Sequence, residues 1–169
     1  MYGLFTAHSL GCPRAPDLAG AYMKSILLVD DSRFMRMANA KALARAGYTV
    51  VTASDGEEAL LVARASLPDL VVLDMLLPKL GGLEVLLALR SSPVTASIPV
   101  IVMSSLPQKN EAKLMKAGAT AYIEKSTMEL DQHSESLLNI VKRTLDAVAV
   151  PEVGAPSPHT SMALASGPA

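Results

Sequence analysis

The stretch DLVVLD, residues 69–74, is a short apolar run that contains β-branched residues and ends in an acid. A run of this length and composition is typical of a strand that is buried on both faces of a sheet. A loop with Pro78 and Gly81-Gly82 follows, and the next residues, LEVLLALR, predict a helix. The stretch therefore indicates one strand–loop–helix unit of a parallel sheet, with Asp74 at the carboxyl end of its strand.

The same alternation of strand and helix continues on both sides of this unit. The further strands are expected at residues 25–30, 48–54, 98–105 and 120–125. The further helices are expected from Ser32 to Ala46 with Gly47 as a stop, from Asp55-Gly56 onwards, at residues 108–118, and along a last apolar face from Leu137 to Val148. Five such units in a chain of this length predict an open, doubly wound α/β sheet, because a barrel needs eight units.

Proline, glycine and small residues divide the 169-residue chain into three parts. We expect residues 1–23 to be a flexible N-terminal extension, residues 24–149 to form the folded domain, and residues 150–169 to be a disordered Pro/Ala-rich tail. The last segment has too few large apolar groups to offset the entropy lost on ordering. No second domain is expected after the fold.

The composition excludes several classes of function. The formal net charge is only -1, which argues against direct binding of nucleic acid or of an anionic membrane. No apolar run reaches the ~18 residues of a transmembrane helix, so no membrane insertion is expected. A single cysteine excludes an intrachain disulfide framework and a cysteine zinc cluster. The methionines Met35, Met37, Met103 and Met115 are expected to fill the core.

Acids, a hydroxyl group and a lysine stand at the carboxyl ends of the predicted strands. They are Asp30 and Asp31 at the end of the first strand, Asp74 at the end of the third, Ser104 at the end of the fourth and Lys125 at the end of the fifth. Ligands of an open α/β sheet bind at this edge, so we expect these side chains to meet there. Clustered carboxylates suit a hard cation such as Mg²⁺, and an aspartate can act as a nucleophile toward phosphorus.

The ordered set LLVDDS, VVLDMLLPKLGGLEVL, IPVIVMSS and GATAYIEK resembles the receiver domain of two-component response regulators, over about residues 24–149. The resemblance implies a flavodoxin-like (βα)5 fold with strand order 2-1-3-4-5. It also implies a phosphoacceptor signalling switch in the cytoplasm rather than an enzyme. At most, such a domain takes a phosphoryl group from a phosphodonor and removes it again.

The resemblance also implies roles for the acids at the sheet edge. Asp74 is similar to the phosphoacceptor of the family, and Asp31 to its direct Mg²⁺ ligand. Asp30 is similar to the second acid of the pair, which acts through water. The backbone carbonyl of Leu76 and the carboxylate of Asp74 would complete the ligands that the protein gives to the metal.

The remaining roles concern the transfer and its consequence. Lys125 resembles the lysine that pairs with the phosphoryl group, Ser104 the switch hydroxyl, and Tyr122 the aromatic residue that changes rotamer with it. In the family the donor is a sensor histidine kinase. The expected output is binding of a downstream protein to the surface formed by residues 108–118, the strand at 120–125 and the last helix.

Two positions depart from the family pattern. Receivers usually have a cis proline after the lysine, and this chain has Ser126, where a cis bond costs about 2.5–4 kcal/mol. Either the loop keeps that strain or it takes a trans path that re-aims Lys125. Leu76 and Leu106 stand where family side chains influence the hydrolytic water, so a slower self-dephosphorylation is expected.

Two alternatives to a phosphorylation switch remain open from the residues. The first is a receiver-like interaction module that works independently of phosphorylation because the turn after Lys125 fails to present the ammonium. The second is a small α/β enzyme or flavin carrier on the same fold. The chain has neither a GxGxxG nor a GxxxxGK[ST] motif and only 4% aromatic residues, which disfavours the second alternative.

Overall fold

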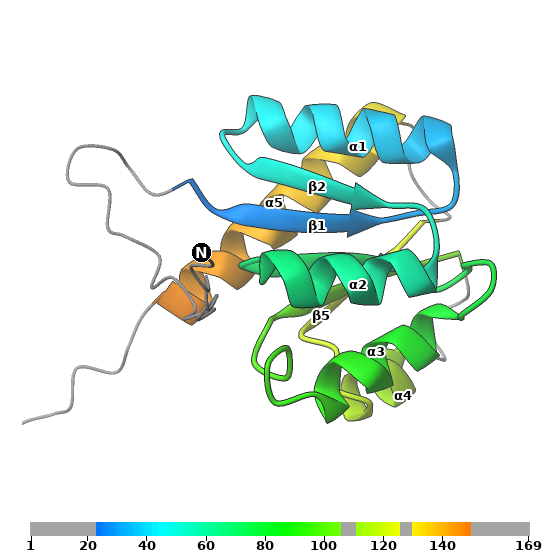
Figure 1. Cartoon of the computed structure of the whole chain (residues 1–169). Coiled ribbons are helices and arrows are strands. Elements are labelled where there is room, and N and C mark those ends of the chain that lie inside the picture. Colours follow the sequence, from blue (N-terminus) through cyan, green and yellow to red (C-terminus); the bar gives the residue numbers. More distant parts are fainter. Residues whose placement is uncertain (1–22, 106–110, 126–129, 150–169) are drawn as a thin grey trace, which may run out of the picture.

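The structure, a computed structural model, describes residues 23–105, 111–125 and 130–149, in which five strands and five helices alternate (Figure 1). The strands are β1 (Ser25–Val29), β2 (Thr49–Ala53), β3 (Leu70–Asp74), β4 (Val100–Ser104) and β5 (Ala121–Glu124). The helices are α1 (Arg33–Arg45), α2 (Gly56–Ser66), α3 (Gly82–Ser91), α4 (Glu111–Lys116) and α5 (Leu130–Ala149).

The strands form one parallel sheet in the order β2-β1-β3-β4-β5. The prediction of an open, doubly wound, flavodoxin-like sheet is thus confirmed. Val29, the last residue of β1, pairs with Ala53 of β2 and Leu73 of β3, and Asp74 pairs with Met103 of β4. The chain places β2 on one side of β1 and then crosses over to place β3 on the other side of β1. The edge beside β1 and β3 is therefore the topological switch point, where such sheets bind ligands.

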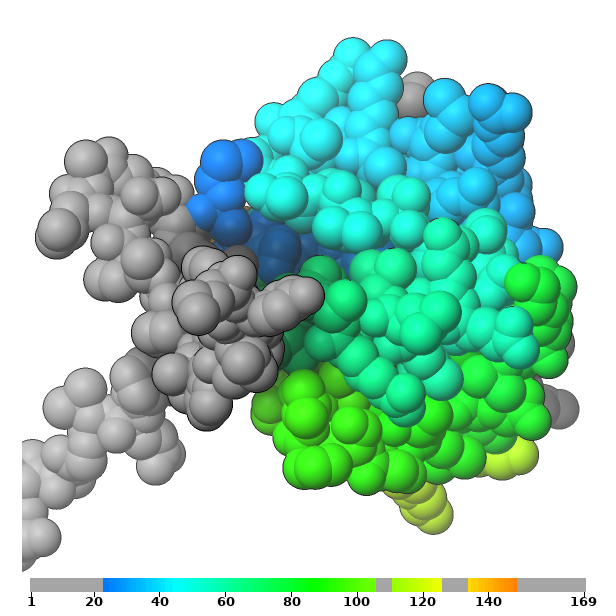
Figure 2. Space-filling view, viewed as in Figure 1, coloured from blue at the N-terminus to red at the C-terminus, as the bar shows by residue number. Residues whose placement is uncertain are grey.

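Two apolar cores, one on each face of the sheet, hold the layers together. Alternate residues of a strand point to opposite faces, so Leu27 and Val29 contribute to one core, and Ile26 and Leu28 contribute to the other. The first core is closed by α2, α3 and α4, and the second by α1 and α5; the teal and green atoms of α2 and α3 form the middle and lower front of the molecule in Figure 2. Burial on both faces explains why the strand sequences are apolar throughout.

The predicted helix ends agree with the structure at α1 and α2. Ser32 is the N-cap of α1 and its hydroxyl accepts from the Met35 N–H, while Asp55 is the N-cap of α2. Gly47, just after α1, has a φ of 91°, which favours glycine. The helix predicted at 108–118 is shorter within the described residues, where α4 begins at Glu111 and ends at Lys116, and residues 106–110 lie outside them.

The prediction that all four methionines fill the core was wrong for Met37 and Met115. Met103 is fully buried, but Met37 is 62% exposed and Met115 is also exposed. The buried positions of α1 are Asn39 and Leu43, and a residue two places from Asn39 lies on the opposite side of the helix. The predicted extension and tail lie outside the described residues, except for Met23. Among the helices that are described, none has the length and apolar character needed to cross a bilayer.

Candidate functional site

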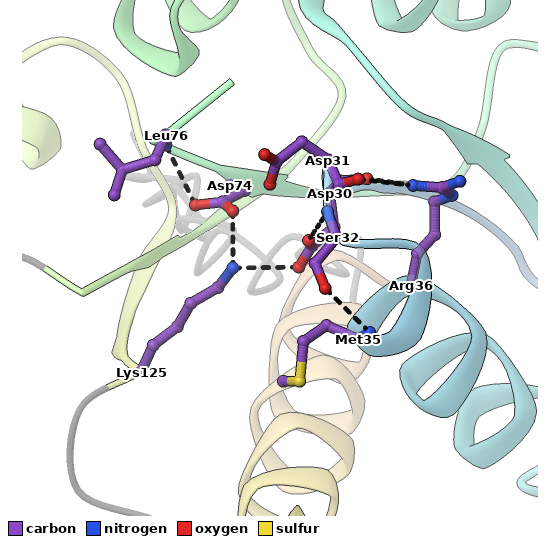
Figure 3. Close-up of polar contacts among 8 residues, drawn as sticks. All are labelled: Asp30, Asp31, Ser32, Met35, Arg36, Asp74, Leu76 and Lys125. Atoms are coloured by element: carbon purple, nitrogen blue, oxygen red, sulfur yellow. Dashed lines mark hydrogen bonds and ion pairs between the residues drawn. The ribbon is translucent and has the colours of Figure 1, made fainter. Parts of the chain in front are cut away.

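The turn from β1 to α1 directs the first two acids of the site. Asp30 is fully buried and its Oδ1 accepts from the Ser32 N–H at 2.9 Å, whereas Asp31 is exposed. The Arg36 guanidinium donates to the backbone carbonyls of Asp30 at 2.6 Å and Asp31 at 3.3 Å (Figure 3). These bonds fix the turn. The Asp30 carboxylate is therefore buried at the sheet edge, and the Asp31 carboxylate lies beside it in solvent.

Asp74 ends β3 in a tightly packed backbone. Its Oδ1 accepts from the Leu76 N–H at 3.1 Å, and the Met75 N–H continues the sheet by donating to the Met103 carbonyl at 3.0 Å. A Cβ on Gly82 would lie 2.4 Å from the Asp74 carbonyl oxygen, so only glycine lets α3 begin against the end of β3. Asp74 is thereby held buried at the switch point.

Lys125 reaches across the sheet edge to both buried acids. Its Nζ lies 2.6 Å from Asp74 Oδ2 and 3.0 Å from Asp30 Oδ2, as Figure 3 shows. Its backbone N–H donates to the Ser104 carbonyl at 2.8 Å, which ties the end of β5 to β4. The ammonium therefore has two carboxylate partners in a site where its side chain is only 13% exposed.

Burial and pairing act in opposite directions on the pKa values of this pair. Burial raises the pKa of Asp74, and although hydrogen bonds from Lys125 and the Leu76 N–H oppose this, the net direction is upward. Burial lowers the pKa of Lys125, but its hydrogen bonds to Asp74 and Asp30 outweigh it and the pKa is raised. The lysine thus stays charged beside the acids.

The three acids offer ligands that a hard divalent cation prefers. One carboxylate oxygen from each of Asp30, Asp31 and Asp74 lies within 4.8 Å of the others. Three carboxylates against the single ammonium of Lys125 leave two negative charges in excess. An all-oxygen donor set with this charge fits Mg²⁺. The predicted part of the Leu76 carbonyl as a ligand stays a prediction.

The two predicted switch residues are in contact. Ser104 is fully buried at the end of β4, and Tyr122 is half-buried in β5. Burial raises the pKa of Tyr122, and a hydrogen bond with the Ser104 side chain opposes this. The phenol and the hydroxyl are therefore joined directly, although their movement on phosphorylation stays a prediction.

Other predicted features lie outside the described residues. Ser126 and Leu106 are among them, so the path of the chain after Lys125 and the second apolar side chain stay predictions. Sequence reasoning also missed Lys79, whose Nζ lies 2.6 Å from Asp55 Oδ2 beside the site. Lys79 has a φ of 64°, which its residue type gives no reason to expect.

The sequence profile of the response regulator receiver domain matches residues 26–137, which is most of the folded chain. The chain belongs to this family. The alkaline phosphatase synthesis transcriptional regulatory protein PhoP of Bacillus subtilis is 38% identical over 118 residues, which cover 68% of this chain and 48% of PhoP. This receiver spans about half the length of that relative.

Solved receivers have the same fold. The chemotaxis response regulator CheY4 of Vibrio cholerae is 29% identical, with a TM-score of 0.66 over 72% of this chain and 98% of CheY4. The phosphorylated cyanobacterial phytochrome response regulator RcpA is 33% identical, with a TM-score of 0.67 over 74% of this chain and 96% of RcpA. The receiver is thus a signalling domain of two-component systems.

Proposed function

We propose that this receiver is a phosphorylation switch that accepts a phosphoryl group from a sensor histidine kinase on Asp74, with Mg²⁺, and then changes its binding to a downstream protein. The observation that carries the proposal is the meeting of Asp30, Asp31, Asp74 and Lys125 at one sheet edge. The family alone supports the histidine kinase as donor and the cytoplasm as location.

The proposed reaction uses the side chain of Asp74 as the nucleophile. A carboxylate oxygen forms a bond to phosphorus as the bond from phosphorus to the imidazole nitrogen of the phosphohistidine breaks, and the electron pair stays with the imidazole. Lys125 and the Leu76 N–H both favour the ionised carboxylate that must attack. Asp31, Asp74 and the Leu76 carbonyl would hold Mg²⁺, with Asp30 acting through water, and the ion would supply positive charge for the phosphoryl oxygens.

The proposed output begins at Ser104. A phosphoryl group on Asp74 offers new acceptor oxygens to this hydroxyl, and Ser104 also contacts Tyr122. Tyr122 lines a hollow of about 480 Å³ between α4, β5 and α5, together with Met115, Ile140 and Arg143. We place the binding surface of the downstream protein in this hollow, because a change in the rotamer of Tyr122 would change the shape of its lining.

Phosphoryl incorporation from a small acyl phosphate tests the function without the kinase. We expect one phosphoryl group per chain by intact-protein mass, only with Mg²⁺ present and not in Asp74→Asn. Asp69→Asn is the matched control, because this acid lies at the opposite end of β3 and binds the Ser25 backbone N–H at 2.7 Å. If folded wild-type protein takes up no phosphoryl group, the alternative of a phosphorylation-independent interaction module takes the place of the proposed switch.

A further inference from the structure

An ion pair outside the acidic site fastens the loop that follows the phosphoacceptor. Lys79, in the loop between β3 and α3, places its Nζ 2.6 Å from Asp55 Oδ2 and 4.0 Å from Glu57 Oε2. Asp55 uses its other oxygen, Oδ1, to accept from the Glu58 N–H at 2.9 Å, which caps α2. One carboxylate thus joins the loop to the start of a helix that packs on the sheet.

The backbone of Lys79 depends on such a tether. Its φ of 64° lies in the left-handed region, a backbone conformation that residues other than glycine and asparagine rarely adopt. A residue is held there only when its surroundings determine it. The hydrogen bond to Asp55 raises the pKa of Lys79, while the Glu58 N–H and then Lys79 lower the pKa of Asp55, so both partners are charged at neutral pH.

The start of α2 also touches the loop directly. A Cβ on Gly56 would lie 2.3 Å from the Leu80 carbonyl oxygen, so no larger residue fits between the helix and the loop. In Figure 2 the green loop adjoins the teal end of α2 at the right edge of the molecule. Position 79 is thus fixed by charge and position 80 by close packing.

The same loop reaches the phosphoacceptor at its other end. The Leu76 N–H donates to Asp74 Oδ1 at 3.1 Å, and Pro78 accepts from the Leu80 N–H at 2.8 Å, which closes a tight turn around Lys79. A shift of position 79 would therefore pass through the turn to the amide that holds the Asp74 carboxylate. It would also move the neighbouring Leu76 carbonyl.

We propose that Lys79 is a positioning residue of the phosphorylation site. By its bond to Asp55 it holds the loop so that the Leu76 N–H keeps its bond to Asp74 and the Leu76 carbonyl stays where it could help to hold a cation. This role rests on the proposed function. It differs from simple stabilisation of α2, because it predicts a change in cation affinity that does not follow the change in stability.

Binding of Mn²⁺, measured by electron paramagnetic resonance of the free ion, tests this role on the full chain. Lys79→Met and Asp55→Asn should each weaken Mn²⁺ binding by roughly three- to tenfold, since the Lys79 side chain is exposed and the pair acts from outside the ligand set. Asparagine still caps α2, so Asp55→Asn removes the charge alone. The double variant should bind no more weakly than either single variant, because one interaction is removed in all three.

Three further variants separate positioning from stability. Lys79→Gly fits the left-handed backbone and so should fold as stably as wild type, yet still bind Mn²⁺ more weakly. Lys79→Arg keeps the positive charge and should restore most of the affinity. Lys24→Met is the matched control, because the Lys24–Asp69 pair, at 3.8 Å, lies at the other end of the sheet and should leave Mn²⁺ affinity unchanged.

Unchanged Mn²⁺ affinity in Lys79→Met and Lys79→Gly, beside a wild type that binds Mn²⁺ and is phosphorylated, would overturn the positioning role and leave the proposed function intact. Additive losses in the double variant would also overturn it. A wild type that neither binds Mn²⁺ nor accepts a phosphoryl group would overturn both. Lower phosphorylation in step with lower Mn²⁺ affinity supports the role.

Discussion

Lys125 and Asp30 are 95 positions apart in the chain, yet the Nζ of one lies 3.0 Å from Oδ2 of the other. The same ammonium lies 2.6 Å from Asp74 Oδ2, so one cation joins the ends of β1, β3 and β5. Each of these carboxylates would be costly to bury by itself. The chemistry of the site and the stability of the sheet edge therefore depend on one side chain.

Replacing Lys125 by methionine should test this dependence. Lys125→Met keeps a long side chain but leaves Asp30 and Asp74 without their shared counterion, so the free energy of unfolding should fall by about 3–5 kcal/mol in the absence of divalent cations. Urea unfolding measures it. Added Mg²⁺ should restore part of the loss, because a cation among the acids replaces the missing charge.

Lys24→Met is the control for this change. Its ammonium lies 3.8 Å from Asp69 and is more exposed, so its loss should cost at most about 1 kcal/mol. Equal losses in the two variants would show that the bridge between β1, β3 and β5 contributes no more than a surface ion pair.

The pKa of Asp74 predicts how stability depends on pH. Burial raises this pKa in the folded state, against the opposing effect of Lys125. An acid shifted upward stabilises the fold below its unfolded pKa, and this contribution is lost as pH rises through the folded value. Asp74→Asn should therefore be more stable than wild type at neutral pH, on the order of 1 kcal/mol, and the difference should vanish toward pH ~4.

Asp55→Asn should show the opposite sign. The Glu58 N–H, and after it Lys79, lowers the pKa of Asp55, so its carboxylate stabilises the fold above the unfolded pKa and this contribution is lost as pH falls. The variant should be less stable than wild type at neutral pH and equal to it in acid. Urea unfolding from pH 4 to pH 8 compares both variants, and a shared sign would contradict the assignment of the Asp74 shift to burial.

The acidic site could be predicted because it follows from the topology. Once the strands were placed in a parallel sheet, Asp30, Asp74 and Lys125 had to meet at the same edge. The apolar, acid-ended strand sequences carry that information directly. No sequence pattern predicts the role of Lys79, since its contact with Asp55 depends on a left-handed backbone that a lysine rarely adopts.

The outward faces of the helices were equally hard to predict. Met37 is apolar but lies away from the sheet, while Asn39 is polar but buried in α1, with no hydrogen-bond partner for its Nδ2 among the described residues. Helical periodicity assigns apolar residues to the buried face of a helix and polar residues to the exposed face, so it places both Met37 and Asn39 on the wrong face of α1. Tertiary packing overrides the pattern at these two positions.

Leu76 should influence how long the phosphoryl group lasts on Asp74. Its side chain is exposed two residues after Asp74, the proposed phosphoacceptor, where an apolar group offers the attacking water no hydrogen bond. Leu76→Asn should shorten the phosphoryl half-life several-fold, as followed by intact mass after removal of the donor. Leu87→Asn, at an exposed leucine of α3, should leave the half-life unchanged. An equal half-life in both variants would remove Leu76 from this role.

Gly82 should tolerate no side chain. A Cβ there would lie 2.4 Å from the Asp74 carbonyl oxygen and 2.6 Å from Met75 Cα, both backbone atoms that cannot rotate away. Gly82→Ala should cost about 1–3 kcal/mol of stability and shift the end of β3. Gly81→Ala is the neighbouring control, because its Cβ would meet only Glu84 Oε2 at 3.4 Å. Thermal unfolding measures the stability of both variants, and equal melting temperatures would contradict the close approach of Gly82 to the Asp74 carbonyl.

Leu67 offers a stabilising change away from the site. It ends α2 with φ 44° and ψ 65°, a left-handed C-cap in which an L side chain costs about 1–2 kcal/mol. Leu67→Gly removes this cost. Two smaller effects oppose the gain: glycine gives the unfolded chain more entropy, and the partial burial of the leucine side chain, which is 45% exposed, is lost. We expect a net gain in unfolding free energy of about 0.5–1 kcal/mol, measured by urea. Leu67→Ala keeps the left-handed cost and should gain nothing. If alanine and glycine proved equally stable, the strain at this C-cap would not exist, and the leucine would be held there by its contacts instead.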